Sequence, residues 1–423
     1  MPIYVGYHLY LCQEMKIAIL SHSDTLGGAA IAASRLADSL RTQGQEVTLI
    51  VMNRHGDGQS TVRAGCGLSR SWAFLSERLD IFLHNRLSKR QLFKVSTAEA
   101  GQNLASMREI CEADLVVVGW ACQGLLALKQ MQRICAMPGK KVAVVMHDLW
   151  WMTGICRYPF GCQRYEKDCG CCKFLGSRHD NDLSRRVWHR KHRLYSRLDN
   201  VAWIAVSRWV KECVARSSLL SREQVKVVHN IFPIDDFVIA PIKPVAQLEA
   251  WAGRKVITMG AASLDNEVKG LDRGIDALNN LPDEWRDKVV VALYGSMKNP
   301  SLLSRLKLPW EWLGPVGHDR LRDILASSHI IMSSARHETY GWTLLEGIAS
   351  GAVAATYGGD GRNDIVNDGV NGFIAGNDSP EALTEALVKA LEKSSSHLSL
   401  RLSQRESVAG LASEPFLPAA LGC

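Results

Sequence analysis

The stretch SARHETYGWTLLEGIASG, residues 334–351, decides how the chain folds. It follows residues 330–332, an apolar Ile-Ile-Met run that predicts a short buried strand. A polar loop with Gly341 comes next, and an apolar helix is expected over residues 343–349, ending at Gly351. A strand, a polar loop and a helix N-terminus form the usual anion-binding place of an α/β sheet. The stretch therefore predicts an α/β protein with a ligand site at this helix.

Two carboxylates, Glu338 and Glu346, lie on either side of the expected helix start. A helix that opens on phosphate should not carry a buried carboxylate there unless the carboxylate has hydroxyl groups to bind. A sugar nucleotide supplies phosphates for the backbone amides and hydroxyls for both carboxylates. The alternative is that Glu338 is solvated and Glu346 is an ordinary helix residue.

The same segment resembles the E-x7-E signature of retaining family 4 glycosyltransferases. The positions that keep the signature are Ser334, Glu338, Gly341, Leu345, Glu346, Ala349 and Gly351. Tyr340 stands where phenylalanine is usual, and Gly347 where alanine is usual. The resemblance implies the GT-B architecture, in which two Rossmann-like doubly wound domains face each other across a cleft and the C-terminal one holds a nucleotide sugar.

Length and composition set bounds on the protein. With 423 residues, 47% hydrophobic and 22% charged, the chain predicts a globular protein of two or three domains. A net charge of +7 favours anionic partners. No apolar run reaches the roughly 18 to 20 residues of a membrane span. Residues 1–14 make a poor signal peptide and are expected to be an extension, so the twelve cysteines favour reduced thiols in the cytoplasm.

The first domain is expected over residues 15–238. A strand at 16–20, the pair Gly27-Gly28 opening a helix, and a strand at 47–52 begin a doubly wound sheet. The glycine pair lacks the G-x-G-x-x-G spacing of a dinucleotide site, which counts against a dehydrogenase. The resemblance implies that Gly27 and Gly28 line the cleft as backbone donors.

A histidine follows another strand of this domain. Residues 142–146 predict a strand, and His147-Asp148 comes directly after it. A histidine at a strand end can hydrogen-bond a sugar hydroxyl, although most such residues have a structural role. The family carries a histidine at this strand end near the donor sugar, which favours His147 as a functional residue.

A cysteine-rich insert is expected over residues 150–175. Cys169 and Cys172 have the spacing that places two thiolates on one tetrahedral ion, and Cys156 and Cys162 could complete the set. A structural zinc and free thiols are equally well supported. A similar insert occurs in a family 4 branch associated with colanic-acid-like and other exopolysaccharide assembly, and this narrows the resemblance.

Residues 185–197 are strongly basic, with apolar residues interleaved. The pattern predicts a helix with a solvated face or, slightly favoured, an amphipathic helix on the anionic inner face of the plasma membrane, near a polyprenyl-diphosphate-linked acceptor. No nucleic-acid-binding motif accompanies the charge, and no nucleic-acid partner is expected.

The second domain is expected over residues 239–393, followed by a tail at 394–423 without a strong pattern. Lys269 before a glycine at a helix start suits a diphosphate, and the resemblance gives it that role. The family usually has an arginine in the preceding loop, where this chain has Ala-Ala-Ser at 261–263. Arg273 or Arg336 would have to compensate for it.

The resemblance thus implies a retaining hexosyltransferase that uses UDP- or GDP-hexose and an acceptor that is lipid-linked or an oligosaccharide, with no metal needed for the chemistry. The resemblance implies that Lys269 binds the diphosphate, Glu346 the ribose, Glu338 the donor sugar, and His147 a hydroxyl near the reaction centre. The other residues assigned to the donor site are Arg336, Tyr340 and Gly341. A catalytically silent scaffold, favoured by the missing arginine, and a GT-B epimerase or phosphorylase stay open.

Overall fold

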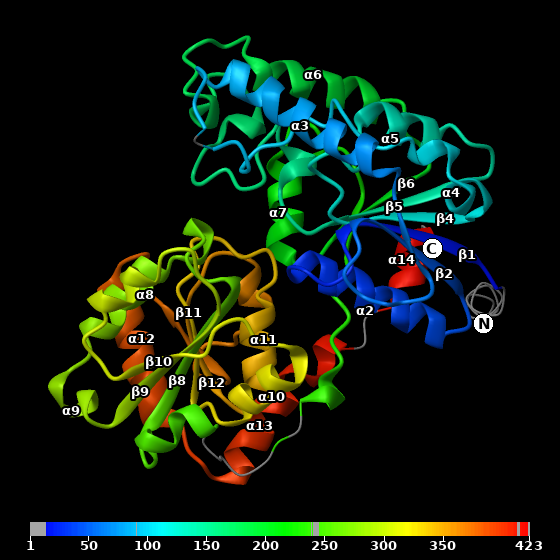
Figure 1. The fold of residues 1–423 in the computed structure, drawn as a ribbon. Helices are drawn as coiled ribbons and strands as arrows, with labels where there is room; N and C mark the ends of the chain where they lie inside the picture. The colour runs from blue at the N-terminus through cyan, green and yellow to red at the C-terminus, as the bar shows by residue number, and fades with distance from the viewer. Residues whose placement is uncertain (1–13, 90, 238, 240–244, 413–414, 422–423) are drawn as a thin grey trace. The chain divides into compact units, whose positions relative to one another are not determined.

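The chain forms two compact units, residues 1–231 with 414–423, and residues 232–413. A computed structural model describes residues 14–89, 91–237, 239, 245–412 and 415–421 (Figure 1). The predicted N-terminal extension therefore lies outside the described residues except for Glu14. The same holds for most of the linker expected between the two domains.

The first unit is built on a seven-stranded sheet in which all neighbouring strands are parallel, in the order β3-β2-β1-β4-β5-β6-β7. Its strands are β1 (Lys16–Ser23), β2 (Glu46–Asn53), β3 (Thr61–Arg63), β4 (Leu115–Val118), β5 (Lys141–Met146), β6 (Val201–Ala205) and β7 (Val225–Val227). The strands β1, β4 and β5 have continuous apolar runs because helices cover both faces of a parallel sheet.

The helices of the first unit flank this sheet (Figure 1). They are α2 (Gly28–Thr42), α3 (Gly67–His84), α4 (Arg108–Glu112), α5 (Leu128–Cys135), α6 (Leu183–Tyr195), α7 (Arg208–Arg216) and α14 (Phe416–Leu421). Single 3-10 turns lie at Leu104–Ser106, Trp150–Met152, Arg164–Glu166 and Lys173–Leu175.

The end of the chain returns to the first unit. Helix α14 packs against β5 and β6, and its residues Phe416 and Leu417 are buried. The sequence of the tail gave no pattern for this crossing. The apolar residues of α14 cover one part of the first sheet.

The second unit repeats the same design. Its sheet has six parallel strands in the order β10-β9-β8-β11-β12-β13. Its strands are β8 (Lys255–Ser263), β9 (Val289–Ser296), β10 (Trp310–Trp312), β11 (Ile330–Ser333), β12 (Val353–Tyr357) and β13 (Gly372–Ala375). When the strands of each sheet are numbered along the chain, the first six lie in the order 3-2-1-4-5-6 in both sheets. This is the Rossmann order.

The helices of the second unit also cover its sheet (Figure 1). They are α8 (Leu271–Asn279), α9 (Asp283–Arg286), α10 (His318–Ala326), α11 (Trp342–Ala349), α12 (Pro380–Lys393) and α13 (Leu398–Ala409). Its 3-10 segments are Ile234–Asp236, Ala246–Trp251, Glu267–Lys269, Pro300–Arg305, Gly361–Asp364 and Gly410–Ala412. None of the helices in the described part of the chain is long and apolar enough to cross a bilayer.

Helix α11 lies unusually close to its sheet at Gly347. A Cβ atom at this position would come within 2.5 Å of the Cβ of Ile331 in β11. The glycine that departs from the family pattern therefore allows the helix to approach the strand. This close packing fixes the helix that carries Glu346.

Candidate functional site

A polar hollow lies at the carboxyl edge of the second sheet. It occupies about 330 Å³, and the loops after β8 and β11 provide most of its walls. Its polar and charged side chains are Lys269, Ser333, Ser334, Glu338 and Thr343. The carboxyl edge is where parallel α/β sheets place their ligands.

Lys269 and Glu338 form an ion pair across this hollow, between the lysine Nζ and the glutamate Oε1. Lys269 ends a 3-10 turn that precedes α8, and Glu338 lies in the loop between β11 and α11. Both side chains stay partly exposed, so an incoming ligand can reach them. The two residues that the sequence assigned to diphosphate and sugar thus lie together, 69 positions apart in the chain.

Gly270 allows the two loops to meet. Its φ of 61° is in the left-handed region, and a Cβ atom there would collide with the carbonyl oxygen of Ser334. Ser334 also donates a hydrogen bond of 3.3 Å from its Oγ to the carbonyl oxygen of Lys269. The start of α8 and the loop of Glu338 therefore form one rigid wall.

Helix α11 begins directly after Gly341 and carries Glu346 in its second turn. Glu346 is 7% exposed. The pKa of the nearby Tyr294 hydroxyl is raised mainly by burial and further by the charge of Glu346. The Tyr294 hydroxyl also hydrogen-bonds Thr343, a wall of the hollow. Tyr340 is buried, with its ring 5.4 Å from that of Trp342.

The two arginines expected to replace the missing family arginine both have partners within the unit. Arg336 makes a two-point contact with Asp272, at 2.9 and 2.6 Å, which lowers the pKa of that carboxyl. Arg273 bonds Asp378 at 3.0 Å and lies 3.9 Å from the centre of the Tyr357 ring. Lys269 is the cation that lines the hollow itself.

A buried ion pair supports the loop of Glu338. Arg362 is 1% exposed and bonds both carboxylate oxygens of Asp360 at 2.8 Å. Asp360 accepts a bond of 2.9 Å from the backbone N–H of Glu338, and Arg362 donates one of 2.9 Å to the carbonyl oxygen of Ala335. The sequence showed only a glycine-rich strand end at 358–361, and this signal did not reveal the pair.

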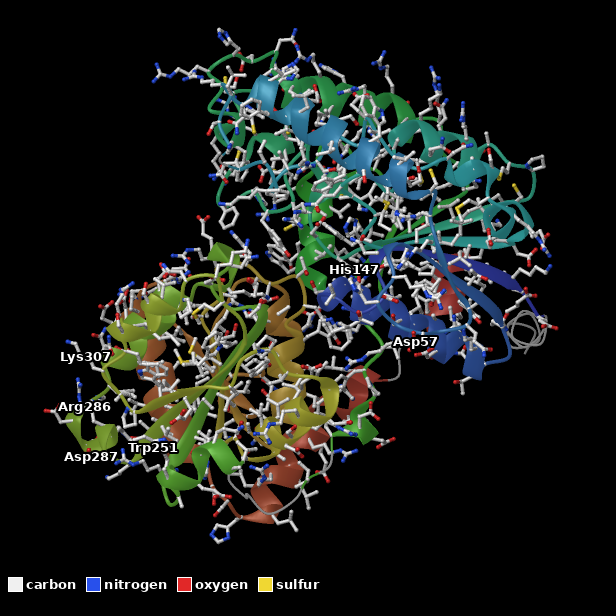
Figure 2. All side chains as sticks on the ribbon, in the orientation of Figure 1. Asp57, His147, Trp251, Arg286, Asp287 and Lys307 are labelled. Atoms are coloured by element: carbon white, nitrogen blue, oxygen red, sulfur yellow. The ribbon has the colours of Figure 1, made fainter. Side chains whose placement is uncertain are left out.

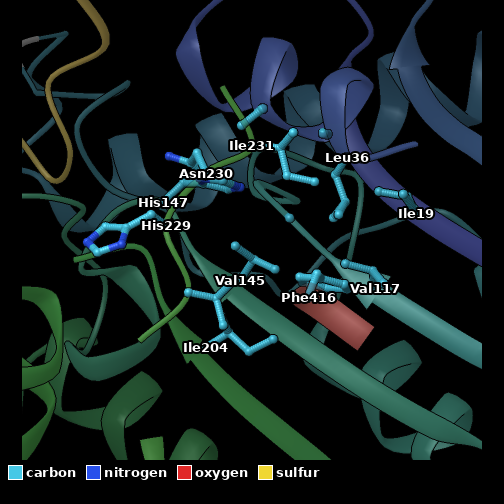
Figure 3. Close-up of a pocket in the computed structure, with 14 residues that line it drawn as sticks. Ile19, Leu36, Val117, Val145, His147, Ile204, His229, Asn230, Ile231 and Phe416 are labelled. Carbon is cyan, nitrogen blue, oxygen red and sulfur yellow. The ribbon is translucent and has the colours of Figure 1, made fainter. Parts of the chain in front are cut away.

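Against the face of the first sheet, the surroundings are mostly apolar. A hollow of about 400 Å³ there is lined by aliphatic side chains, by His147 and Asn230, and by Phe416 of α14 (Figure 3). His147 follows β5 and is also marked in Figure 2. Burial lowers the pKa of His147 to about 4, so its ring is neutral at pH 7 and can both donate and accept a hydrogen bond.

Asp148 anchors the turn after His147. Its carboxylate accepts bonds from Trp120 Nε1 at 2.8 Å and from the backbone N–H of Trp150 at 2.9 Å. Lys191 of α6 donates to the carbonyl oxygens of Trp150 and Thr153 at 2.5 and 3.0 Å. Burial lowers the pKa of Lys191 to about 7. These contacts hold the turn that carries His147.

The predicted glycine pair lies at the start of a helix, as expected. Gly27 precedes the first turn of α2, and Gly28 begins the helix. Gly27 has a φ of 95°. The predicted role of both glycines as backbone donors stays a prediction.

The four cysteines predicted to bind zinc lie close enough to influence one another. Burial raises the pKa of Cys169 to about 12 and of Cys172 to about 11, and each is also affected by neighbouring thiols. Burial also raises the pKa of Cys156, and the nearby thiols of Cys172, Cys169 and Cys162 raise it further. Among the described residues, however, no group of three or more His, Cys, Asp or Glu side chains is arranged to hold a metal ion. The structure gives the zinc prediction no support.

The basic segment 185–197 forms most of α6, but its apolar residues face the interior. Val187, Trp188, Leu194 and Tyr195 are all buried. They cannot enter a bilayer while the unit is folded. This helix therefore offers only its charged face to solvent.

Comparison with known proteins bears directly on the second unit. Residues 253–393 match the family model for glycosyl transferases group 1. No curated protein sequence matches the chain. The matched residues contain the whole hollow with Lys269, Glu338 and Glu346.

Solved structures resemble the chain over nearly its whole length. Anabaena HepE in complex with UDP and glucose has a TM-score of 0.63 at 15% identity, covering 94% of this chain and 97% of that one. Sucrose-phosphate synthase from Thermosynechococcus elongatus has a TM-score of 0.63 at 15% identity, covering 96% of each chain. WaaG, a glycosyltransferase involved in lipopolysaccharide biosynthesis, has a TM-score of 0.56 at 15% identity, covering 96% and 97%. The chain has the GT-B fold, with two Rossmann-like units, as its sequence predicted.

Proposed function

We propose that the chain is a retaining glycosyltransferase that transfers a hexose from a nucleotide sugar to an acceptor hydroxyl. The observation that carries this proposal is the pairing of Lys269 with Glu338 in a polar hollow beside the helix of Glu346. One cation and two carboxylates at a helix N-terminus suit a molecule with both a diphosphate and sugar hydroxyls. The match of residues 253–393 to glycosyl transferases group 1 supports the same ligand class.

In the proposed mechanism, Lys269 and the first amides of α11 stabilise the charge that develops on the departing diphosphate. Preorganised cations and amides are effective there because they need little reorganisation during the reaction. Lys269 would leave Glu338 and turn to the phosphates, which frees Glu338 to bind the donor hexose. Glu346 binds the ribose hydroxyls, while Arg336, Tyr340 and Gly341 shape the wall of the donor site. No metal is needed for this chemistry.

His147 has a different proposed role. As a neutral imidazole it binds a hydroxyl of the sugar close to the reaction centre. Gly27 and Gly28 provide backbone N–H groups at the start of α2. The acceptor is a lipid-linked glycan or an oligosaccharide of exopolysaccharide assembly, and the donor is UDP- or GDP-hexose. Because a structural neighbour was solved with UDP and glucose, UDP-hexoses are the first donors to test.

The direct test is turnover. The purified chain is incubated with UDP- and GDP-hexoses, with and without polyprenyl-diphosphate-linked glycans, and release of nucleoside diphosphate is measured. The proposal expects release that depends on the acceptor and is lost in Lys269→Met. Product analysis by NMR should show the anomeric configuration of the donor retained.

A nucleotide-binding scaffold is the second candidate, and one observation favours it. Among the residues that the structure describes, Lys269 is the one cation lining the hollow, and Arg273 and Arg336 are held by Asp378 and Asp272. Donor binding without turnover for any acceptor would establish the scaffold. Phosphate-dependent release of a sugar phosphate would instead indicate a phosphorylase, and a changed nucleotide sugar without acceptor an epimerase.

A structural zinc at Cys156, Cys162, Cys169 and Cys172 is tested separately by metal content. One zinc per chain that is lost in Cys169→Ser/Cys172→Ser would support it. A metal-free protein with the full thermal stability and reactive thiols would exclude it.

A further inference from the structure

Helix α3 of the first unit carries its large apolar residues on the outside. Leu68, Trp72, Leu75, Leu79 and Leu83 are between 57% and 86% exposed. They recur every three or four positions and so form one continuous stripe along the helix. The helix has 18 residues, which gives the stripe a length of about 25 Å. We call this set of five residues the α3 stripe.

The exposed apolar residues of the protein are concentrated here. Of the twelve large apolar side chains that are exposed in the described part of the chain, seven fall between residues 68 and 93. Leu87 and Phe93, which follow the helix, are exposed as well, and the ring of Phe93 stacks on that of Phe74 in α3. Single exposed leucines are ordinary on a protein surface, but a contiguous apolar stripe marks an interaction site.

The opposite face of α3 is polar and buried, so the helix cannot rotate to hide the stripe. Glu77 is 1% exposed, accepts a bond from Ser96 Oγ at 2.6 Å, and bonds the backbone N–H groups of Thr97 and Ala98 at 2.8 and 3.1 Å. It also pairs with Arg78 at 2.6 Å. Turning the helix would break this buried ion pair, which is costly.

Apolar packing fixes the same face. Ile81 lies in a buried cluster with Leu183 and Val187 of α6 and with Phe174 of the cysteine-rich insert. Figure 1 shows α3 and α6 side by side in the first unit. The side of α3 that faces outward is therefore set by both polar and apolar contacts on its inner side.

The charges around the α3 stripe are positive. The exposed residues Arg86 and Lys89 follow its end. Arg70, near its beginning, lies on the other side of the helix and donates to the carbonyl oxygen of Gly65. Of the two acidic residues of α3, Glu77 is buried and Asp80 contacts His84 at 3.2 Å. Helix α6 adds the exposed residues Arg186 and Arg193 to the same unit, and Arg197 follows the helix. An apolar stripe with cations beside its end fits a surface that is apolar inside and anionic outside.

We propose that the α3 stripe binds the first unit to an anionic phospholipid bilayer, with the leucines and Trp72 among the acyl chains and the flanking cations on the phosphates. A second copy of the chain fits less well. In a parallel pair of α3 helices, Arg86 and Lys89 of the two copies would face each other, and in either arrangement a copy offers no phosphates for these cations. This proposal does not depend on the proposed transfer reaction, because it rests on a different unit from the donor site.

The test is flotation of the full chain with vesicles of phosphatidylcholine, alone or mixed with phosphatidylglycerol. We expect binding to the mixed vesicles, weakened by salt, and at least about tenfold weaker binding for Leu75→Ser/Leu79→Ser. The matched control is Leu398→Ser/Leu402→Ser, which changes two exposed leucines with the same spacing on α13 and should bind like the unchanged protein. Arg86→Glu/Lys89→Glu should remove the preference for phosphatidylglycerol.

The substituted leucines are exposed, so the folded state should persist, and an unchanged thermal midpoint verifies this. The proposal is overturned if the unchanged protein stays with the unbound fraction, or if the α3 variant binds as well as the α13 control. It is also overturned if gel filtration shows a dimer that only the α3 variant breaks while vesicle binding is unaffected. Donor binding measured on the α3 variant should be normal, which separates failure here from failure of the proposed function.

Discussion

The two sheets of this protein have the same order for their first six strands, yet the hollows beside them differ in chemistry. In the second unit, charged pairs hold the edge: Lys269 with Glu338, and Asp360 with Arg362. In the first unit, aliphatic residues and Phe416 line most of the hollow, and His147, His229 and Asn230 are its polar side chains. The comparison shows that one topology can present a hollow suited to a charged ligand or a hollow suited to a neutral one.

The largest effect is expected from the buried charge of the second unit. Asp360→Asn leaves Arg362 buried without its counter-charge, so the free energy of unfolding should fall by about 4 kcal/mol. The loop of Glu338 also loses its support. Denaturant unfolding measures the change.

The matched control is Asp378→Asn, which removes the exposed partner of Arg273. Exposed pairs contribute little, and the expected loss is under about 1 kcal/mol. Equal losses for the two variants would mean that the buried pair does not hold the edge.

The first unit should instead depend on apolar packing. Phe416→Ala removes a buried ring that covers the hollow between α14 and the sheet, and the expected cost is about 3 kcal/mol. Leu402→Ala, at an exposed position of α13, is the control. A loss below about 1 kcal/mol for Phe416→Ala would show that α14 is not needed to complete the first unit.

Catalysis should be more sensitive to the charged edge. Lys269→Met should lower kcat/KM about 100-fold, or about 2.7 kcal/mol, because the departing diphosphate loses its cation. Lys307→Met changes an exposed lysine of the same unit, labelled in Figure 2, and should have no effect. Steady-state kinetics decide the matter, and an unaffected Lys269 variant would remove this lysine from the proposed mechanism.

The smallest expected effect concerns pH and the first unit. Because burial holds the pKa of His147 near 4, below the ordinary 6.5, the unfolded chain takes up a proton between these values and the folded chain does not. The contribution of His147 to stability is therefore fully present above pH 6.5 and is lost as the pH falls towards 4, at no more than about 1.4 kcal/mol per pH unit.

His147→Gln should reduce the slope of the free energy of unfolding against pH in that window. The slope should not vanish, because His22 and His329 also have pKa values lowered by burial. An unchanged slope in the variant would show that His147 titrates normally in the folded state.

Much of the donor-site unit could be predicted because its signals are local. The spacing of Glu338 and Glu346 and the placement of Lys269 before a glycine each fit within a single loop or helix start. The Asp360–Arg362 pair could not be predicted in this way. The two residues are only two positions apart, but their bonds to Glu338 and Ala335 form because β12 lies beside β11, which brings the loop after one strand against the loop after the other.

The surface of the first unit was harder to predict for a similar reason. The leucines of α3 have the spacing of an ordinary core-facing helix, and only the burial of Glu77 and Arg78 shows that they point outward. In α6, the mixture of basic and apolar residues suggested a membrane helix, but tertiary packing uses its apolar side. Periodicity gives the faces of a helix, while the neighbours decide which face is covered.

The central claim is that the second unit binds a nucleotide sugar through Glu346, and a thermal-shift measurement with UDP, GDP, ADP and their hexose conjugates tests it most directly. A ligand at about 100 times its Kd adds roughly 2.7 kcal/mol to the free energy of unfolding. The account predicts stabilisation by one base and its conjugate, lost in Glu346→Ala and kept in Glu385→Ala, which changes an exposed glutamate of α12. Stabilisation by none of these nucleotides, or equal stabilisation of both variants, would contradict it.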